Sequence, residues 1–196
     1  MNKKQEKIKN FLREAEKLKQ VKRKTYLSNK KERESAAEHS WDLILMAMAL
    51  QEYFPKKVET LKIIKILAVH DLAEIDNGDV FALDKSQKDK KIKQEKEAAE
   101  RIFNILPKNK KLEFSRLWQE YEEGSSIEAR VAKAIDRMAP IAQFNASQAI
   151  DKKFKVSTQE CYDYAIESIK EFPKLKNYFL GLIRETAKIK KDKVEF

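Results

Sequence analysis

The segment from Ser35 to Phe54 restricts the possible fold more than any other part of the chain. Its centre, Leu43–Leu50, is an unbroken apolar run that is too short to span a bilayer. Ser35, followed three residues later by Glu38, matches a capping box at a helix start, and Pro55 ends the pattern. A helix that is apolar on nearly all sides belongs at the centre of a bundle of other helices.

The rest of the chain is able to supply those helices. Its 196 residues include only 3 Gly and 4 Pro, and this shortage of turn residues favours long helices over hairpins. Apolar residues at helical spacing predict further helices at about residues 8–21, 57–72, 84–104, 108–122, 126–142, 158–170 and 175–190. Pro140 is expected to kink the helix that contains it.

These patterns predict an all-α fold. The length fits one domain over residues 1–196, with a core at about 8–185 and a frayed, basic C-terminal tail. The polar and basic segment 20–35 is expected to be a loop, and loops on rigid scaffolds often carry binding residues.

The charge of the chain limits its partners. The formal net charge of +10 arises from 42 Lys and Arg against 32 Asp and Glu, and such a balance can attract nucleic acid. The lysines are spread along the chain and interleaved with Glu, which is typical of a solvated surface, so nucleic acid is not the expected partner. The Lys-rich segment 85–96 could be a lid or an exposed insertion, but a solvated helix start is favoured.

Weaker signals concern the compartment. Cys161 is the single cysteine, so no internal disulfide can form, which fits a reducing compartment. Residues 1–7 are charged and lack the apolar core of a signal peptide. We therefore expect a soluble, cytoplasmic protein without a membrane partner.

Only two histidines occur in the chain, and both lie beside acids near long apolar segments. Taken alone, His39 or His70 is more often a core or capping residue than a metal ligand. His70 is followed directly by Asp71, however, and a divalent ion takes mixed imidazole and carboxylate ligands. If the helices on either side of Pro55 are antiparallel, the start of one meets the end of the other, and the two histidines meet as well.

A fourth ligand is expected from a distant acid. Asp136 lies inside an otherwise apolar helix, where a buried carboxylate needs a partner. A metal ion would be such a partner. A salt bridge to Arg137 or Lys133 is an equally acceptable interpretation of the sequence alone.

The pattern of His39, His70-Asp71 and Asp136 resembles the H…HD…D pattern of the HD-domain metal-dependent phosphohydrolases. The blocks Glu34–Trp41 and His70–Asp79 are similar to the 5′-deoxynucleotidase branch of that superfamily, and the resemblance extends over about residues 18–145. The branch that hydrolyses hyperphosphorylated guanine nucleotides usually has Glu-Asp where this chain has Glu74-Ile75. The Gly-Tyr-Pro signature of the cyclic-dinucleotide branch is absent.

The resemblance implies an HD-type helical bundle with one divalent transition metal ion, such as Mn²⁺, Co²⁺ or Zn²⁺, and a homodimer. It also implies roles for individual residues: His39, His70, Asp71 and Asp136 as metal ligands, Glu74 for the attacking water, Arg23 for the phosphate, Asp79 for the sugar hydroxyl and Tyr26 for stacking on sugar or base. Without the resemblance, Glu74 would be interpreted as an exposed helix acid and Arg23 as one of many basic loop residues.

The expected activity is hydrolysis of the 5′-phosphate of deoxynucleoside monophosphates to nucleoside and phosphate. One alternative is another HD phosphohydrolase that acts on a different phosphomonoester or phosphodiester. A second alternative is a non-catalytic, basic nucleotide- or RNA-binding module that holds a structural metal.

Overall fold

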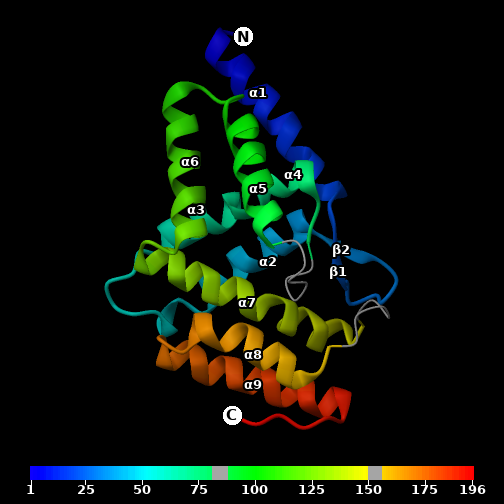
Figure 1. Cartoon of the computed structure of the whole chain (residues 1–196). Coiled ribbons are helices and arrows are strands. Elements are labelled where there is room, and N and C mark those ends of the chain that lie inside the picture. Colours follow the sequence, from blue (N-terminus) through cyan, green and yellow to red (C-terminus); the bar gives the residue numbers. More distant parts are fainter. Residues whose placement is uncertain (81–87, 150–155) are drawn as a thin grey trace.

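Helix α7 (Ile127–Ser147) is the central element of the fold, because it contacts helices on both sides and the strand β1. The computed structural model describes residues 1–80, 88–149 and 156–196. Figure 1 shows α8 (Thr158–Ile169) and α9 (Pro173–Lys190) covering one side of α7, and α5 (Lys88–Phe103) and α6 (Lys108–Glu123) lying beyond its other side. The prediction of an all-α fold is confirmed.

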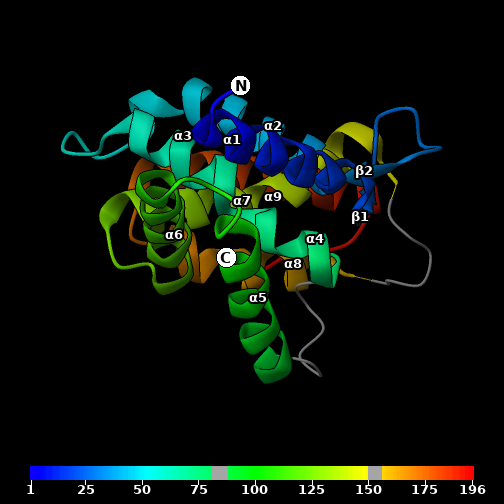
Figure 2. The same cartoon turned by 90° about the horizontal axis from the view of Figure 1, so that it is seen from above.

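The remaining elements complete the bundle around α7. They are α1 (Lys3–Ala15), α2 (Ala36–Ala49), α3 (Thr60–Val69), α4 (Glu74–Asn77), the strands β1 (Lys22–Tyr26) and β2 (Arg33–Ser35), and the short 3₁₀ helices η1 (Glu16–Gln20), η2 (Gln51–Tyr53) and η3 (His70–Ala73). Figure 2 shows α5 extending away from the rest of the bundle. Among the described residues, no helix has both the length and the apolar character needed to cross a membrane.

The start of α2 is fixed by its own sequence. The Ser35 hydroxyl accepts a hydrogen bond from the Glu38 amide at 3.2 Å, and the Glu38 carboxylate accepts one from the Ser35 amide at 2.7 Å. This reciprocal pair is the predicted capping box. It places His39 in the first turn of the helix.

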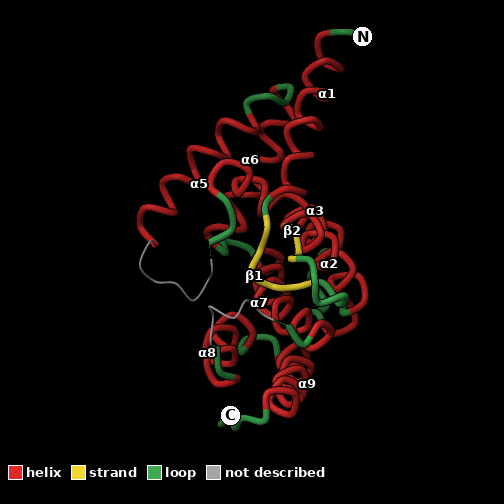
Figure 3. Tube along the Cα trace, turned by 90° about the vertical axis from the view of Figure 1, so that its right-hand side faces the viewer, coloured by secondary structure: helices red, strands yellow, loops and turns green. Residues whose placement is uncertain are grey.

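The segment 20–35 differs from its prediction as a loop. Strands β1 and β2 form an antiparallel hairpin, with Lys22 opposite Ser35 and Tyr26 opposite Arg33 (Figure 3). Its charged composition hides the alternation by which strands are usually found. The hairpin matters for the site, since it holds Arg23 on a paired strand.

The sequence predicted that helix α2 is buried on nearly all sides, but one of its faces is exposed. Leu43 and Ala47 are fully buried, but Trp41, Leu45 and Met48 are 60%, 44% and 53% exposed. The exposed residues follow one another at helical spacing and therefore share one face. An apolar run in a sequence does not show which of its faces other helices cover. Helix α2 lies at the edge of the bundle, and α7 takes the central place.

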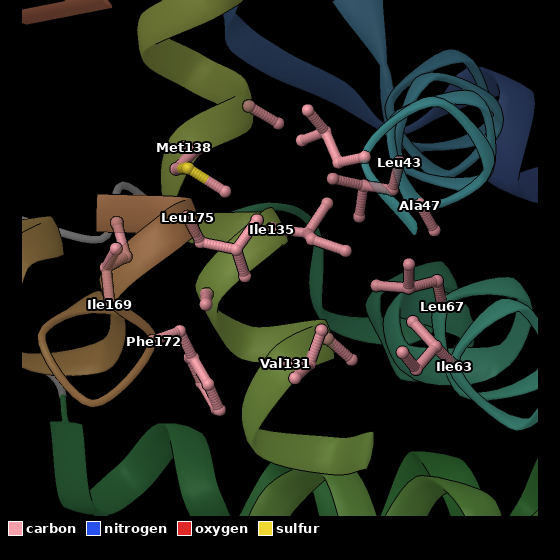
Figure 4. Packing of buried hydrophobic residues seen from close by; sticks show 14 of the residues in the cluster. Leu43, Ala47, Ile63, Leu67, Val131, Ile135, Met138, Ile169, Phe172 and Leu175 are labelled. Atoms are coloured by element: carbon pink, nitrogen blue, oxygen red, sulfur yellow. The ribbon is translucent and has the colours of Figure 1, made fainter. Parts of the chain in front are cut away.

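Two hydrophobic clusters stabilise the bundle. The first joins α2, α3, α7, α8 and α9, and Figure 4 shows part of it, including Leu67 of α3 and Ile135 of α7. The second joins α1, η1 and α5 and includes Val69 and Leu72. The chain therefore passes from one cluster to the other between Leu67 and Val69, at the end of α3 and just before His70.

The helix predicted over residues 108–122 is α6, and Gly124 ends it in the left-handed conformation with φ of 62°. Pro140 lies inside α7 without ending it, and the expected kink stays a prediction. The Lys-rich segment begins outside the described residues, and its described part belongs to α5.

The C-terminal tail contacts α8, although the sequence analysis predicts it to be frayed. The Asp192 carboxylate accepts a hydrogen bond from the Thr158 amide at 2.9 Å. The Phe196 ring meets the Tyr162 ring edge-on, with centroids 5.6 Å apart. Contacts at both ends of the segment hold the tail against the bundle.

Candidate active site

Three elements bring the four predicted metal ligands together. His39 comes from the first turn of α2, His70 and Asp71 from η3, and Asp136 from the middle of α7. His39 Nε2 lies 3.0 Å from Asp136 Oδ1, and His70 Nε2 lies 3.0 Å from Asp71 Oδ1 and 4.0 Å from Asp136 Oδ1. Both imidazoles are buried. Residues far apart in the sequence thus form one cluster.

The geometry of this cluster fits a single divalent ion. Ligand atoms bound at about 2.1 Å lie about 3 Å apart when adjacent and about 4.2 Å apart when opposite. One atom each of His39, His70 and Asp136 lies within 4.8 Å of the others. His70 Nε2 and Asp71 Oδ2 are buried and make no hydrogen bond among the described residues, although Arg23 NH1 lies 3.5 Å from Asp71 Oδ2. Because buried polar atoms nearly always have partners, a cation is the natural one here.

Oxygen atoms next to the Nδ1 atoms of both histidines orient their imidazole rings. His70 Nδ1 donates to the Leu67 carbonyl at 2.8 Å, which leaves the Nε2 lone pair directed at the cluster. His39 Nδ1 faces Glu34 Oε1 at 3.8 Å, and Glu34 is only 2% exposed. A carboxylate or carbonyl behind a metal-binding imidazole is a common arrangement in metal sites.

Asp136 has partners of a kind that the sequence did not indicate. Its Oδ2 accepts a hydrogen bond from the Tyr121 hydroxyl at 2.8 Å, while Oδ1 lies against His39. Burial alone would raise the pKa of Asp136, but His39, His70 and Arg137 hold the pKa well below its ordinary value. Asp136 is therefore ionised, as a metal ligand must be.

The alternative of a salt bridge from Asp136 to a neighbouring basic residue is not what the structure shows. Lys133 Nζ donates to the backbone carbonyl of Glu122 at 2.9 Å. The guanidinium of Arg137 lies 4.4 Å from the centre of the Tyr164 ring. Each basic side chain makes this contact with a group other than the Asp136 carboxylate.

Arg23 of β1 reaches the same cluster. One of its terminal nitrogens, NH1, lies 3.5 Å from Asp71 Oδ2 and 3.3 Å from Asp79 Oδ1, and its Nε lies 3.5 Å from Glu34 Oε2. Burial would lower the pKa of Arg23, but Asp71 and Asp79 raise it above its ordinary value. A buried guanidinium thus keeps its charge next to the predicted metal ligands.

One cavity of about 240 Å³ joins these groups, close to the lower end of the usual range for small-molecule sites. The residues that line it include Arg23, His70, Asp71, Glu74, Asp79 and Asp136. Glu74 is buried at the start of α4, and Gly78, with φ of 73°, makes the turn that precedes Asp79. Six of the predicted site residues therefore line the same cavity, and His39, which does not line it, contacts Asp136.

Tyr26 is the exception among the predicted substrate-binding residues. It is not one of the residues that line the cavity, and its backbone carbonyl accepts a hydrogen bond from Gln143 Nε2 at 2.6 Å. Other aromatic side chains line the cavity in its place: Trp118, Tyr121, Phe144 and Tyr164. The sequence analysis missed Tyr121, although a hydroxyl on an apolar helix face is a signal, since a buried tyrosine usually needs a hydrogen-bond partner.

Comparison with known proteins agrees with this geometry. Residues 15–176 match the family model described as HD domain. The chain belongs to the HD-domain family. The predicted membership of this family and the predicted HD-type helical bundle are thereby confirmed.

Several relatives of this HD-domain chain have names that state an activity. A human protein named 5′-deoxynucleotidase HDDC2 is 31% identical over 144 residues, which cover 73% of this chain and 69% of the human protein. A Saccharomyces cerevisiae protein named 5′-deoxynucleotidase YBR242W is 30% identical over 192 residues, covering 94% of this chain and 69% of the yeast protein.

A solved structure is also similar over nearly the whole chain. It is described as a predicted metal-dependent phosphohydrolase from Magnetospirillum magnetotacticum. The two chains are 32% identical with a TM-score of 0.87, and the match covers 96% of this chain and 95% of the other. The arrangement of helices around the cluster is thus shared with a solved member of the fold.

Proposed function

We propose that this HD-domain chain, folded as a single domain, hydrolyses the 5′-phosphate of deoxynucleoside monophosphates and releases nucleoside and phosphate. The observation that carries the proposal is the convergence of two imidazoles, two carboxylates and a charged guanidinium on one cavity. The names of the human and yeast relatives point to the same substrate class.

The metal ligands proposed are His39, His70, Asp71 and Asp136. This mixed nitrogen and oxygen set suits Mn²⁺, Co²⁺ or Zn²⁺. When bound, such an ion polarises a phosphoryl oxygen and lowers the pKa of water. The protein contributes by holding each ligand in place before the substrate arrives.

Arg23 is the proposed phosphate contact. A guanidinium matches two phosphate oxygens and offsets their charge. Its NH1 is already oriented by Asp71 and Asp79, so little side-chain entropy is lost when phosphate binds. The ion pairs also hold Arg23 beside the metal ligands.

Glu74 and Asp79 are proposed to act on water and sugar. Glu74, one turn after Asp71 and buried at the cavity wall, takes the proton from the attacking water as a general base. Asp79, placed by the turn at Gly78, accepts a hydrogen bond from a sugar hydroxyl. Both acids line the cavity in addition to the proposed metal ligands, and a purely structural metal would not need them there, which favours catalysis.

The test measures phosphate release from a panel of deoxynucleoside and ribonucleoside monophosphates after loading with Mn²⁺ or Co²⁺, together with metal content. Asp71→Asn should lose both metal and activity, whereas Glu74→Gln should keep the metal and lose kcat. The exposed acid Asp163 provides a matched control, Asp163→Asn, which should behave as wild type. Metal-loaded wild type that releases no phosphate from any deoxynucleotide would contradict the proposal, and turnover of another phosphoester alone would favour a different HD phosphohydrolase.

We also propose that two copies associate through the exposed face of α2. Trp41, Leu45 and Met48 form an apolar stripe, and a twofold axis would let it cover the same stripe of a second copy. Sedimentation or light scattering should give a dimer for wild type and a monomer for Leu45→Glu. A monomeric wild type at micromolar concentration would contradict this.

A cytoplasmic location is part of the same proposal. It is supported by the lone Cys161, which has no partner for an internal disulfide. Fractionation of cells that express the full chain would test it.

A further inference from the structure

Helix α4 is too short to hold its own position. It has only four residues, Glu74–Asn77, whereas the cost of starting a helix is recovered over several turns. Glu74 lies at its start, and Asp79 comes directly after the turn at Gly78 that ends it. The two acids that the proposed function assigns to water and sugar therefore depend on neighbouring elements for their placement.

A second face of α4 is available for a contact outside the cavity. Asp76 is the exposed residue of this helix, whereas Glu74 is buried and lines the cavity. Residues two positions apart on a helix do not face the same way, so the two carboxylates lie on different faces. Asp76 does not line the cavity. One face of α4 thus serves the cavity, and the face of Asp76 meets other elements of the bundle.

Arg101 of α5 makes this second contact. Its Nε donates to Asp76 Oδ2 and its NH2 donates to Asp76 Oδ1, both at 2.6 Å. The same NH2 donates to Glu14 Oε1 of α1 at 2.7 Å. A planar guanidinium that binds both carboxylate oxygens fixes direction as well as distance. We call Glu14, Asp76 and Arg101 the Arg101 clamp, because they join α1, α4 and α5, which lie close together in Figure 1.

The Arg101 clamp is more rigid than an isolated surface ion pair. Such pairs contribute little, since two long side chains are ordered for one contact. Here one guanidinium serves two carboxylates, and Glu14 is only 13% exposed and also accepts a hydrogen bond from Lys17 at 2.7 Å. The backbone that carries Arg101 is anchored as well, because Ala98 and Ile102 of α5 are buried in the second hydrophobic cluster.

We propose that Arg101 is a positioning residue for the reaction, which holds α4 through Asp76 and thereby places Glu74 and Asp79 at the cavity. The inference rests on the proposed function, which gives those two acids their roles. Arg101 itself does not line the cavity and has no contact with the substrate in this proposal.

The proposed metal ligands next to α4 have supports of their own. His70 Nδ1 donates to the Leu67 carbonyl at 2.8 Å, and Arg23 NH1 lies 3.5 Å from Asp71 Oδ2. Neither contact involves α4 or α5. Loss of the Arg101 clamp should therefore change the reaction while metal affinity is retained.

Hydrogen exchange tests the clamp without turnover. The Gly78 amide donates to the Glu74 carbonyl at 2.8 Å, so its exchange reports the opening of α4. In Arg101→Gln this amide should exchange about 3- to 10-fold faster, which corresponds to about 0.7–1.4 kcal/mol. Arg130→Gln is the matched control, because Arg130 makes an exposed ion pair with Glu171 at 2.8 Å and lies on α7.

Steady-state kinetics with dAMP after loading with Mn²⁺ test the consequence for the reaction. In Arg101→Gln, kcat should fall about 5- to 50-fold and KM should rise, since a shift of about 1 Å at a reacting group can cost about 100-fold. Affinity for Mn²⁺ should stay within about twofold. Arg130→Gln should behave as wild type in all three measurements.

Two further variants separate positioning from general stability. Arg101→Lys keeps the charge but lacks the planar fork, so it should recover only part of kcat. Asp76→Asn should reproduce the loss in Arg101→Gln, and the double variant should be no worse than the more affected single variant, because both remove the same contact. Thermal unfolding of each variant reports on the fold.

The outcomes distinguish this inference from the proposed function. Failure of the wild type to release phosphate from any deoxynucleotide overturns the proposed function and the role of Arg101 in the reaction. An active wild type with unchanged exchange at Gly78 in Arg101→Gln overturns the positioning role alone. A lower unfolding temperature with wild-type kcat and KM, or losses that add in the double variant with Asp76→Asn, does the same.

Discussion

The two ends of the cavity are held in different ways. At the metal end, side chains are fixed by hydrogen bonds and ion pairs to other elements, as in the contact of Asp136 with His39 and Tyr121. At the end between α7 and α8, which we call the α7–α8 end, Pro140, Ile141 and Phe144 provide mainly van der Waals surface. Charge stabilisation depends steeply on position and must be preorganised, whereas dispersion has no direction and tolerates small shifts. Substitutions should therefore have graded effects from one end to the other.

The largest effect is expected at the carboxylate that joins the metal cluster. Asp136→Asn removes the charge shared by His39 and Tyr121 and should lower metal affinity by more than the roughly 10–100-fold that is usual for residues behind the ligands. Phosphate release should be lost at the same time. Titration calorimetry with Mn²⁺ measures the affinity, and Asp163→Asn is the control. Metal binding at wild-type affinity would show that Asp136 is not a ligand.

A smaller effect is expected at Glu34, which acts through its neighbours as a positioning residue. Its carboxylate faces His39 Nδ1 at 3.8 Å and Arg23 Nε at 3.5 Å, and it accepts a hydrogen bond from the Thr25 hydroxyl. Glu34→Gln keeps the shape and removes the charge, so metal affinity should fall about 10–100-fold and KM should rise.

Comparing metal affinity and KM with the unfolding temperature tests the role of Glu34. Glu32→Gln changes an exposed acid of the same hairpin and should leave metal affinity and KM unchanged. A purely structural role would lower the unfolding temperature of Glu34→Gln without changing metal affinity in the variant that remains folded. That result would contradict the positioning role.

Tyr121→Phe should have an effect of similar size at the same end. The variant keeps the ring, whose centre lies 5.0 Å from that of His70, and removes only the hydroxyl that donates to Asp136. A hydrogen bond to a charged group contributes about 1.5–3 kcal/mol, so metal affinity should fall at least about tenfold. Equal affinities for Mn²⁺ in wild type and Tyr121→Phe would reduce Tyr121 to a packing role.

The sequence predicted the proposed metal ligands better than the residues that position them. Two histidines and their adjacent acids stand out in a chain rich in lysine, and the capping box located His39 at a helix start. Glu34 and Tyr121 have ordinary roles locally, and only the folded chain brings Tyr121 to Asp136. Helical periodicity also could not show that the Trp41 face of α2 is exposed, because solvent and protein neighbours leave the same pattern in a sequence.

The smallest effect on activity is expected at the α7–α8 end. Ile141 is only 5% exposed and belongs to the first hydrophobic cluster, so Ile141→Val should lower the free energy of unfolding by about 0.5–1.5 kcal/mol. The lost methyl gives up a few contacts of about 0.1–0.2 kcal/mol each, so kcat/KM for all four deoxynucleotides should change by less than about threefold. Asp136→Asn should show the opposite profile, with activity lost and the fold retained. A loss of activity in Ile141→Val comparable to that in Tyr121→Phe would mean that the apolar end positions the substrate as strictly as the metal end does.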